Sequence, residues 1–170
     1  MAGHGTYARK TPPGTKIPRW YCRDSHTTIS LLPDCLAARL PGTLDEVEAV
    51  VAHAEEAPGQ SAAADALRRD PVGLPGAIRW VRRRVLLVHH ALTLVIGLLP
   101  DQLARCIAEV GAVRTRLETD SALVALRALT AAQLPELPAP LGFQPHRRGA
   151  TIRNRRFQHK MGPDPPSQPA

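Results

Sequence analysis

One long segment, residues 75–99, constrains the fold of this chain more than any other feature. Its apolar residues recur at alternating spacings of three and four, which places them along one side of an α-helix: Ile78, Val81, Val85, Val88, Leu92, Val95 and Leu99. The opposite side carries Arg79 and Arg83, with Arg82, Arg84 and Trp80 on its flanks. In the second half, Leu86, Leu87 and Leu94 make that side apolar too, which is typical of a buried helix. We therefore expect a basic first half and a core-forming second half. The alternative is a core helix whose arginines are only solvated.

The distribution of charge indicates the kind of partner. Residues 1–42 contain six basic and two acidic groups, residues 75–100 four and none, and residues 138–170 six and one. The segments between these basic blocks are acidic or near neutral. This arrangement favours a polyanion partner, most simply nucleic acid. Anionic lipid is the rival, but the chain has no strongly basic amphipathic helix with exposed bulky apolar residues, and residues 85–99 are too short to span a bilayer.

Length and composition favour one small, mainly helical domain. The chain has 170 residues, its aromatic content is only 4%, and alanine and leucine are abundant. Three cysteines without a framework spacing are typical of a reducing compartment. The first ten residues, MAGHGTYARK, lack the apolar run of a signal peptide. We expect a cytoplasmic protein.

The region before residue 40 is the only one whose pattern predicts strands. Residues 5–10, 16–22 and 27–31 are short β-prone runs, and Pro12-Pro13-Gly14 marks the first turn. Cys22 and His26 lie at the edges of the second turn, with a spacing that could supply two metal ligands. A structural zinc site needs four, and His4 and Cys35 are the only nearby candidates. We expect a metal-free hairpin and no cofactor.

Residues 17–34, IPRWYCRDSHTTISLLPD, resemble the second knuckle of a zinc-ribbon domain. That domain is found at the N-terminus of bacterial insertion-sequence transposases and in related stand-alone proteins of unknown function. The family pattern is I-P-R-aromatic-x-C-x-x-C followed by T-F-S-x-L-P-D. Here Ser25 occupies the position of the second cysteine, and no first CxxC knuckle precedes it. The resemblance implies a degenerate zinc-ribbon-like hairpin over residues 1–40, and the two departures argue against a bound zinc.

Residues 43–135 are predicted to form a helical domain. Thr43-Leu44-Asp45-Glu46 is a capping box that opens a first helix, which Pro58-Gly59 ends. A short helix over residues 61–67 and the long basic segment follow. A short second helix and a basic third one are typical of a helix-turn-helix, over residues 43–99. Because a helix-turn-helix follows the zinc ribbon in the transposases, the resemblance implies that residues 76–84 act as the recognition helix.

The remaining chain is predicted to contain two more helices and a tail. Residues 101–117 read as a fourth helix, and a fifth begins at Asp120 or Ser121 and ends at Pro135. These two helices are expected to cover the apolar second half of the third. From Leu137 to residue 170 the chain is rich in proline and then basic, which predicts a disordered tail. Its Arg153, Arg155 and Arg156 either bind phosphates or only keep the protein soluble.

No pattern in the sequence predicts catalysis. Nucleotide-binding, nucleophile-elbow and zinc-protease motifs are missing. The adjacent His89 and His90 point about 100° apart on a helix and cannot share one metal. Cys106 falls on an apolar stripe, and Glu55-Glu56 at a helix end read as solvated. The three-carboxylate catalytic domain of transposases has no room after residue 117, so we expect a protein that neither cuts nor joins DNA.

These observations converge on a non-catalytic, transposase-related protein that binds double-stranded DNA. Its predicted DNA-binding residues are Arg79, Trp80, Arg82, Arg83, Arg84, Arg153, Arg155 and Arg156. The alternative is a helical protein-interaction module whose third helix docks a transposase or a second copy of the chain. Salt distinguishes the two, because only DNA binding weakens steeply as salt rises. A thiol or metal enzyme would rest on Cys22 and His26 alone, without a base or a full ligand set.

Overall fold

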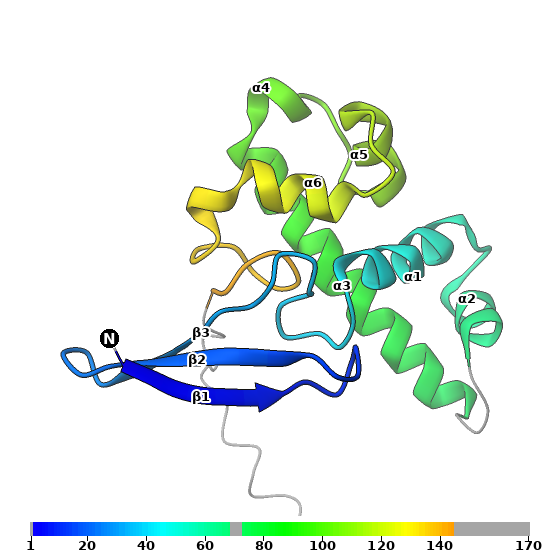
Figure 1. Ribbon diagram of the computed structural model, residues 1–170. Coiled ribbons are helices and arrows are strands. Elements are labelled where there is room, and N and C mark those ends of the chain that lie inside the picture. The colour runs from blue at the N-terminus through cyan, green and yellow to red at the C-terminus, as the bar shows by residue number, and fades with distance from the viewer. Residues whose placement is uncertain (1, 69–72, 145–170) are drawn as a thin grey trace, which may run out of the picture.

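The computed structural model describes residues 2–68 and 73–144, which form a three-stranded sheet followed by six α-helices (Figure 1). The prediction of a mainly helical chain with a small β region at its N-terminus is confirmed. Helix α3 (Leu74–Leu98) runs diagonally through the molecule. The other helices lie around it and the sheet lies below (Figure 1).

The sheet is antiparallel, with the strand order β1-β2-β3. Its strands are β1 (Ala2–Ala8), β2 (Lys16–Cys22) and β3 (Thr27–Ser30), close to the three predicted runs. Every residue of β1 and β3 is exposed, and in β2 only Ile17 is buried. The helices therefore do not cover either face of the sheet.

Three helices follow where the sequence predicts them: α1 (Leu44–Glu56), α2 (Gln60–Leu67) and α3. The capping box is confirmed, because Thr43 Oγ1 accepts from the Glu46 N–H at 3.1 Å and Glu46 Oε2 accepts from the Thr43 N–H at 2.9 Å. Pro75 occupies the first turn of α3, where its missing N–H costs no hydrogen bond. Among the helices of residues 2–68 and 73–144, none combines the length and hydropathy that a membrane span requires.

The prediction of one helix over residues 101–117 is wrong. The segment forms a single turn, α4 (Pro100–Leu103), and then α5 (Val110–Leu117). Arg105 between them has a left-handed φ of 58°, which interrupts the helix. A new helix start at Val110 is possible because the side chain of Glu55 accepts the free N–H groups there.

Helix α6 (Ala122–Leu129) and a short 3-10 turn, η1 (Ala131–Gln133), replace the predicted fifth helix. All the helices except α2 share one apolar core, in which the inner side of the second half of α3 packs against the later helices. Its buried members include Val88, Leu92, Val95, Leu103, Val110, Leu123 and Leu126. The expectation that the later helices cover α3 is therefore confirmed for one side of it.

A fully buried carboxylate joins three helices at this core. Glu48 on α1 accepts from Arg114 Nε of α5 at 2.6 Å. It also accepts from the Ala122 and Leu123 N–H groups at the start of α6, at 2.9 and 2.6 Å. Ser121 is the N-cap residue of α6, as predicted, but its side chain makes no capping hydrogen bond. The cap comes from 74 residues earlier in the chain, which no local pattern reveals.

Glu55 caps the start of α5 in the same way that Glu48 caps α6. Its carboxylate accepts from the Val110 N–H at 3.0 Å and the Gly111 N–H at 3.4 Å, and it lies 2.9 Å from His89 Nε2 of α3. The Glu55 side chain is only 14% exposed. The expectation of a solvated Glu55 is therefore wrong, whereas Glu56 is exposed.

The helical part of the protein extends beyond the predicted boundary at Leu137. Residues 137–142 are buried, with Leu137 and Leu141 in the main core. The buried Arg127 of α6 donates to the carbonyl oxygens of Leu141 and Pro140 at 2.9 and 2.6 Å. The predicted start of the tail was therefore too early, because these hydrogen bonds and two leucines hold a proline-rich segment in place. Residues 145–170, including Arg153, Arg155 and Arg156, lie outside the described residues.

The segment over residues 33–43 connects the sheet to the helices through two arginines. Arg9, just after β1, donates to the carbonyls of Ala37, Leu40 and Gly42. Arg127 of α6 donates to the carbonyls of Asp34 and Leu36 in the same segment. Burial lowers the pKa of Arg127, and this arginine forms no ion pair with any residue that the structure describes.

We expect Glu48→Gln to lower the free energy of unfolding by about 3 kcal/mol, because it leaves buried donors facing an amide that cannot accept from all of them. Urea denaturation followed by circular dichroism measures this loss. Glu46→Gln is the matched control on the same helix, since glutamine also completes a capping box, and it should change stability by only a few tenths of a kcal/mol. Equal effects of the two substitutions would contradict the role of Glu48.

Candidate nucleic-acid interface

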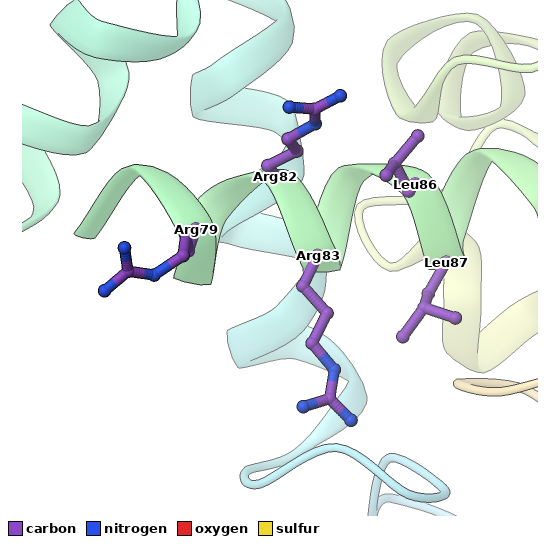
Figure 2. Close-up of a pocket in the computed structure, with 5 residues that line it drawn as sticks. All are labelled: Arg79, Arg82, Arg83, Leu86 and Leu87. Carbon is purple, nitrogen blue, oxygen red and sulfur yellow. The ribbon is translucent and has the colours of Figure 1, made fainter. Parts of the chain in front are cut away.

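The first half of α3 presents three exposed guanidinium groups. Arg79, Arg82 and Arg83 project from the helix into solvent in different directions (Figure 2). With Leu86 and Leu87 they line a shallow depression of about 360 Å³. Figure 2 shows the two leucines on the next turn of the helix, beside the arginines.

A small second core fixes the inner side of this half. Ala63 and Ala64 of α2 are buried with Ala77 and Val81 of α3. Apolar residues of α1, such as Val50, pack against the same cluster. The small alanine side chains allow α2 and α3 to approach closely, so the outer side of α3 is held in a defined orientation.

The three exposed arginines have no ion-pair partner within residues 2–68 and 73–144. The ion pairs found there are Arg68–Asp65, Arg114–Glu48 and His89–Glu55. No aspartate or glutamate occurs in α3 itself. The outer side of the helix is thus a local concentration of positive charge that is available to a polyanion.

Arg84 departs from the prediction, because the structure buries it. It is 5% exposed, its guanidinium lies 3.9 Å from the centre of the Trp80 ring, and it donates to the Trp80 carbonyl at 3.3 Å. Burial, followed by repulsion from Arg83, lowers the pKa of Arg84 to about 10. The guanidinium remains charged at neutral pH, so the cost of burying it is present below about pH 10 and is relieved only above that value.

The buried arc of α3 explains this error. Ala77, Val81, Val88 and Ala91 are buried together with Arg84, so the inward direction lies nearer to Arg84 than the large apolar residues indicate. Ala77 and Ala91 are therefore the residues in the sequence that indicate which side of α3 is buried. Trp80 is 39% exposed beside the three free arginines and remains within reach of a ligand.

The second half of α3 is not buried on all sides, contrary to the expectation. Leu86, Leu94 and Leu98 are 60%, 39% and 46% exposed. His90, Thr93 and Gly97 are exposed on the same side of the helix. The later helices pack only against the inner side, so a strip of exposed leucines, interrupted by His90 and Thr93, continues from the basic surface along the outer side.

The predicted metal-ligand candidates, His4, Cys22, His26 and Cys35, do not gather into a three-ligand site in the described residues. No group of three or more potential ligands occurs in the part of the chain that the structure describes. Hydrogen bonds from Ser25 lower the pKa of the Cys22 thiol, and His26 Nδ1 bonds with the Tyr21 hydroxyl at 2.9 Å instead. Cys35 is exposed, while Cys106 packs against the main core as predicted.

Comparison with known proteins provides no relative: no family model, no curated protein and no solved structure matches the chain.

We expect Arg84→Met to leave stability unchanged or raise it, because methionine keeps an unbranched apolar stem and removes a buried charge that forms no ion pair within the described residues. Arg84→Ala should lower the free energy of unfolding by about 1 kcal/mol or more through lost packing. Urea denaturation measures both effects. Neither variant should change affinity for duplex DNA. If the methionine variant folds normally but binds duplex DNA more weakly, Arg84 belongs to the DNA interface.

Proposed function

We propose that this chain is a non-catalytic protein that binds double-stranded DNA through the first half of α3. The observation that supports this function best is the set of three exposed, unpaired guanidiniums on the outer side of a helix whose inner side is fixed by two cores. Such a helix can enter the major groove of duplex DNA without rearrangement of the fold.

The three arginines would have two kinds of role in this interface. Arg79 and Arg83 lie one helical turn apart, so they can contact neighbouring phosphates or the edge of a guanine. Each phosphate contact releases counterions, which makes the affinity dependent on salt. Arg82 and the ring of Trp80 lie beside them and would add a contact to the backbone.

The order of α1, α2 and α3 also supports this proposal. The short α2 packs against α3 through alanines, and α1 contributes to the same small core, as the supporting helices of a helix-turn-helix do. The likeness of residues 17–34 to the zinc-ribbon region of insertion-sequence transposases points to the same function. We therefore propose that the chain is related to the DNA-recognition part of those enzymes.

Replacing Arg79 and Arg83 together with alanine should weaken duplex binding and make the slope of log affinity against log salt shallower by about one unit per lost phosphate contact. The melting temperature should be almost unchanged, because both side chains are exposed. Fluorescence anisotropy with a labelled duplex at several salt concentrations measures the slope.

Arg105→Ala/Arg116→Ala is the matched control, because it removes the same charge near α4 and α5, at the opposite end of α3 (Figure 1). This control should keep the slope of the parent protein. An unchanged affinity in the α3 double variant would exclude α3 as the recognition helix.

The exposed leucines favour a second candidate function, a protein-interaction module in which the outer strip of α3 docks a second copy of the chain. Leu86, Leu94 and Leu98 repeat at spacings of eight and four, as in a helix-helix contact. Burying them in a dimer would remove an apolar strip from water.

If this docking occurs, Leu94→Glu should convert a dimer into a monomer in sedimentation velocity experiments, because it places a charge in the centre of the contact. Ile107→Glu is the control, since Ile107 is 58% exposed but does not lie on α3. Parent protein that is monomeric at high micromolar concentration would contradict self-docking.

A further inference from the structure

The sheet is unusual in that both of its faces are open to solvent along most of their length. Strand register determines which residues share a face. Tyr7 lies opposite Ile17 in β1 and β2, and Trp20 lies opposite Ile29 in β2 and β3. Because side chains alternate along a strand, Tyr7, Arg19 and Tyr21 share one face, and Trp20 lies on the other.

Ring contacts confirm this assignment. The Arg19 guanidinium carbon lies 6.0 Å from the centre of the Tyr7 ring. The His4 ring lies 5.8 Å from that of Tyr21, whose hydroxyl bonds with His26. We call this surface, made by Tyr7, Arg19, Tyr21, His4 and His26, the ring face.

The residues of the ring face contact one another, but their rings stay largely exposed, and Ile17 opposite Tyr7 is the one fully buried residue that shares this face. Tyr7 is 40% exposed, both histidines are exposed, and Tyr21 is half-buried. Three of the six tyrosine, tryptophan and phenylalanine residues of the whole chain lie in β1 and β2, although no core there requires them. Their position on the surface therefore favours a ligand over a packing role.

The excess of positive charge around the ring face indicates the class of ligand. Residues 2–31 contain five basic side chains and a single acidic one, Asp24, in the turn between β2 and β3. Arg19 lies on the ring face itself, between the two tyrosines. This combination of exposed rings and positive charge is the one that binds unpaired nucleotides, since rings stack on bases and arginine contacts phosphates.

We propose that the ring face binds single-stranded nucleic acid, with one base stacked on Tyr7, another on Tyr21, and Arg19 on the phosphate backbone between them. Tyr21 lies four residues along β2 from Ile17, the position opposite Tyr7, which is a distance of about 13 Å. A segment of several nucleotides covers this distance, in the range of about 4–16 nucleotides that small single-strand-binding domains occupy.

This site differs from the duplex interface in place and in chemistry. The bases of a duplex are stacked on each other, so their faces are not available to the tyrosines, whereas an unpaired strand exposes them. No residue of the ring face belongs to α3. The two sites can therefore be tested separately.

The test measures the affinity of the full chain for a fluorescent oligothymidylate of about twelve nucleotides by anisotropy. Tyr7→Ala and Tyr21→Ala should each weaken binding about 5-fold or more, as expected for one lost stacking contact. Tyr7→Phe and Tyr21→Phe keep the rings and should bind like the parent. Trp20→Ala is the matched control, because it removes an exposed ring from the opposite face of the same strand, and it should also keep the parent affinity.

Four outcomes would overturn the proposal: no binding of oligothymidylate, an equal loss with Trp20→Ala, an unchanged affinity in both tyrosine-to-alanine variants, or displacement of the oligonucleotide by polyglutamate at equal charge concentration. The last would show an acidic-protein site instead. Circular dichroism and thermal melting verify that each variant is folded. Arg79→Ala/Arg83→Ala should bind oligothymidylate like the parent protein, so failure of the duplex proposal leaves this test intact.

Discussion

The arrangement of the helices depends on carboxylates of α1 that accept hydrogen bonds from the starts of later helices. Glu48 caps α6 and Glu55 caps α5, seven residues apart on the same side of α1. Both later helices have only eight residues and no side-chain cap of their own. Helices of this length are marginal alone, and a carboxylate at the N-terminus also interacts favourably with the helix dipole. Since α3 packs against α1, these caps also set the side of α3 that faces solvent.

A second set of polar interactions, made by Arg9 and Arg127, connects the sheet to the helices. Arg9 and Arg127 donate to carbonyls of residues 34–42, and Ala37 and Leu40 of the same segment belong to the main core. The connection therefore combines directed hydrogen bonds with apolar packing. The sheet is therefore positioned without burying its faces, and only Ile17 is enclosed. This explains how a small protein keeps three large aromatic rings of one sheet accessible, and why the ring face and the outer side of α3 can exist on one chain.

Local signals in the sequence predicted local structure well, and long-range contacts account for most errors. The capping box, Pro75 and the turn before β2 each act within a few residues, and the elements they mark occur where expected. The split of residues 101–117 depends on Glu55, more than fifty residues earlier in the chain, and the burial of residues 137–142 depends on Arg127. In the candidate site, Arg79 and Arg83 are exposed as predicted, whereas Arg84 is buried, because the inward arc of α3 is set by contacts with α1 and α2.

The internal use of arginine changes how the net charge of +7 should be interpreted. Arg9, Arg84, Arg114 and Arg127 are engaged with carbonyls, a ring or a carboxylate, so their charges are not free to meet a partner. On α3 only the three guanidiniums of Arg79, Arg82 and Arg83 remain free to contact phosphates. Three phosphate contacts give a slope of log affinity against log salt of about −2.7. A steeper slope with duplex DNA would mean that basic residues outside α3 also contact phosphates. Repeating the titration with Arg19→Ala then shows whether the sheet supplies that contribution, because a duplex that crosses from α3 to the sheet would lose about one further unit of slope.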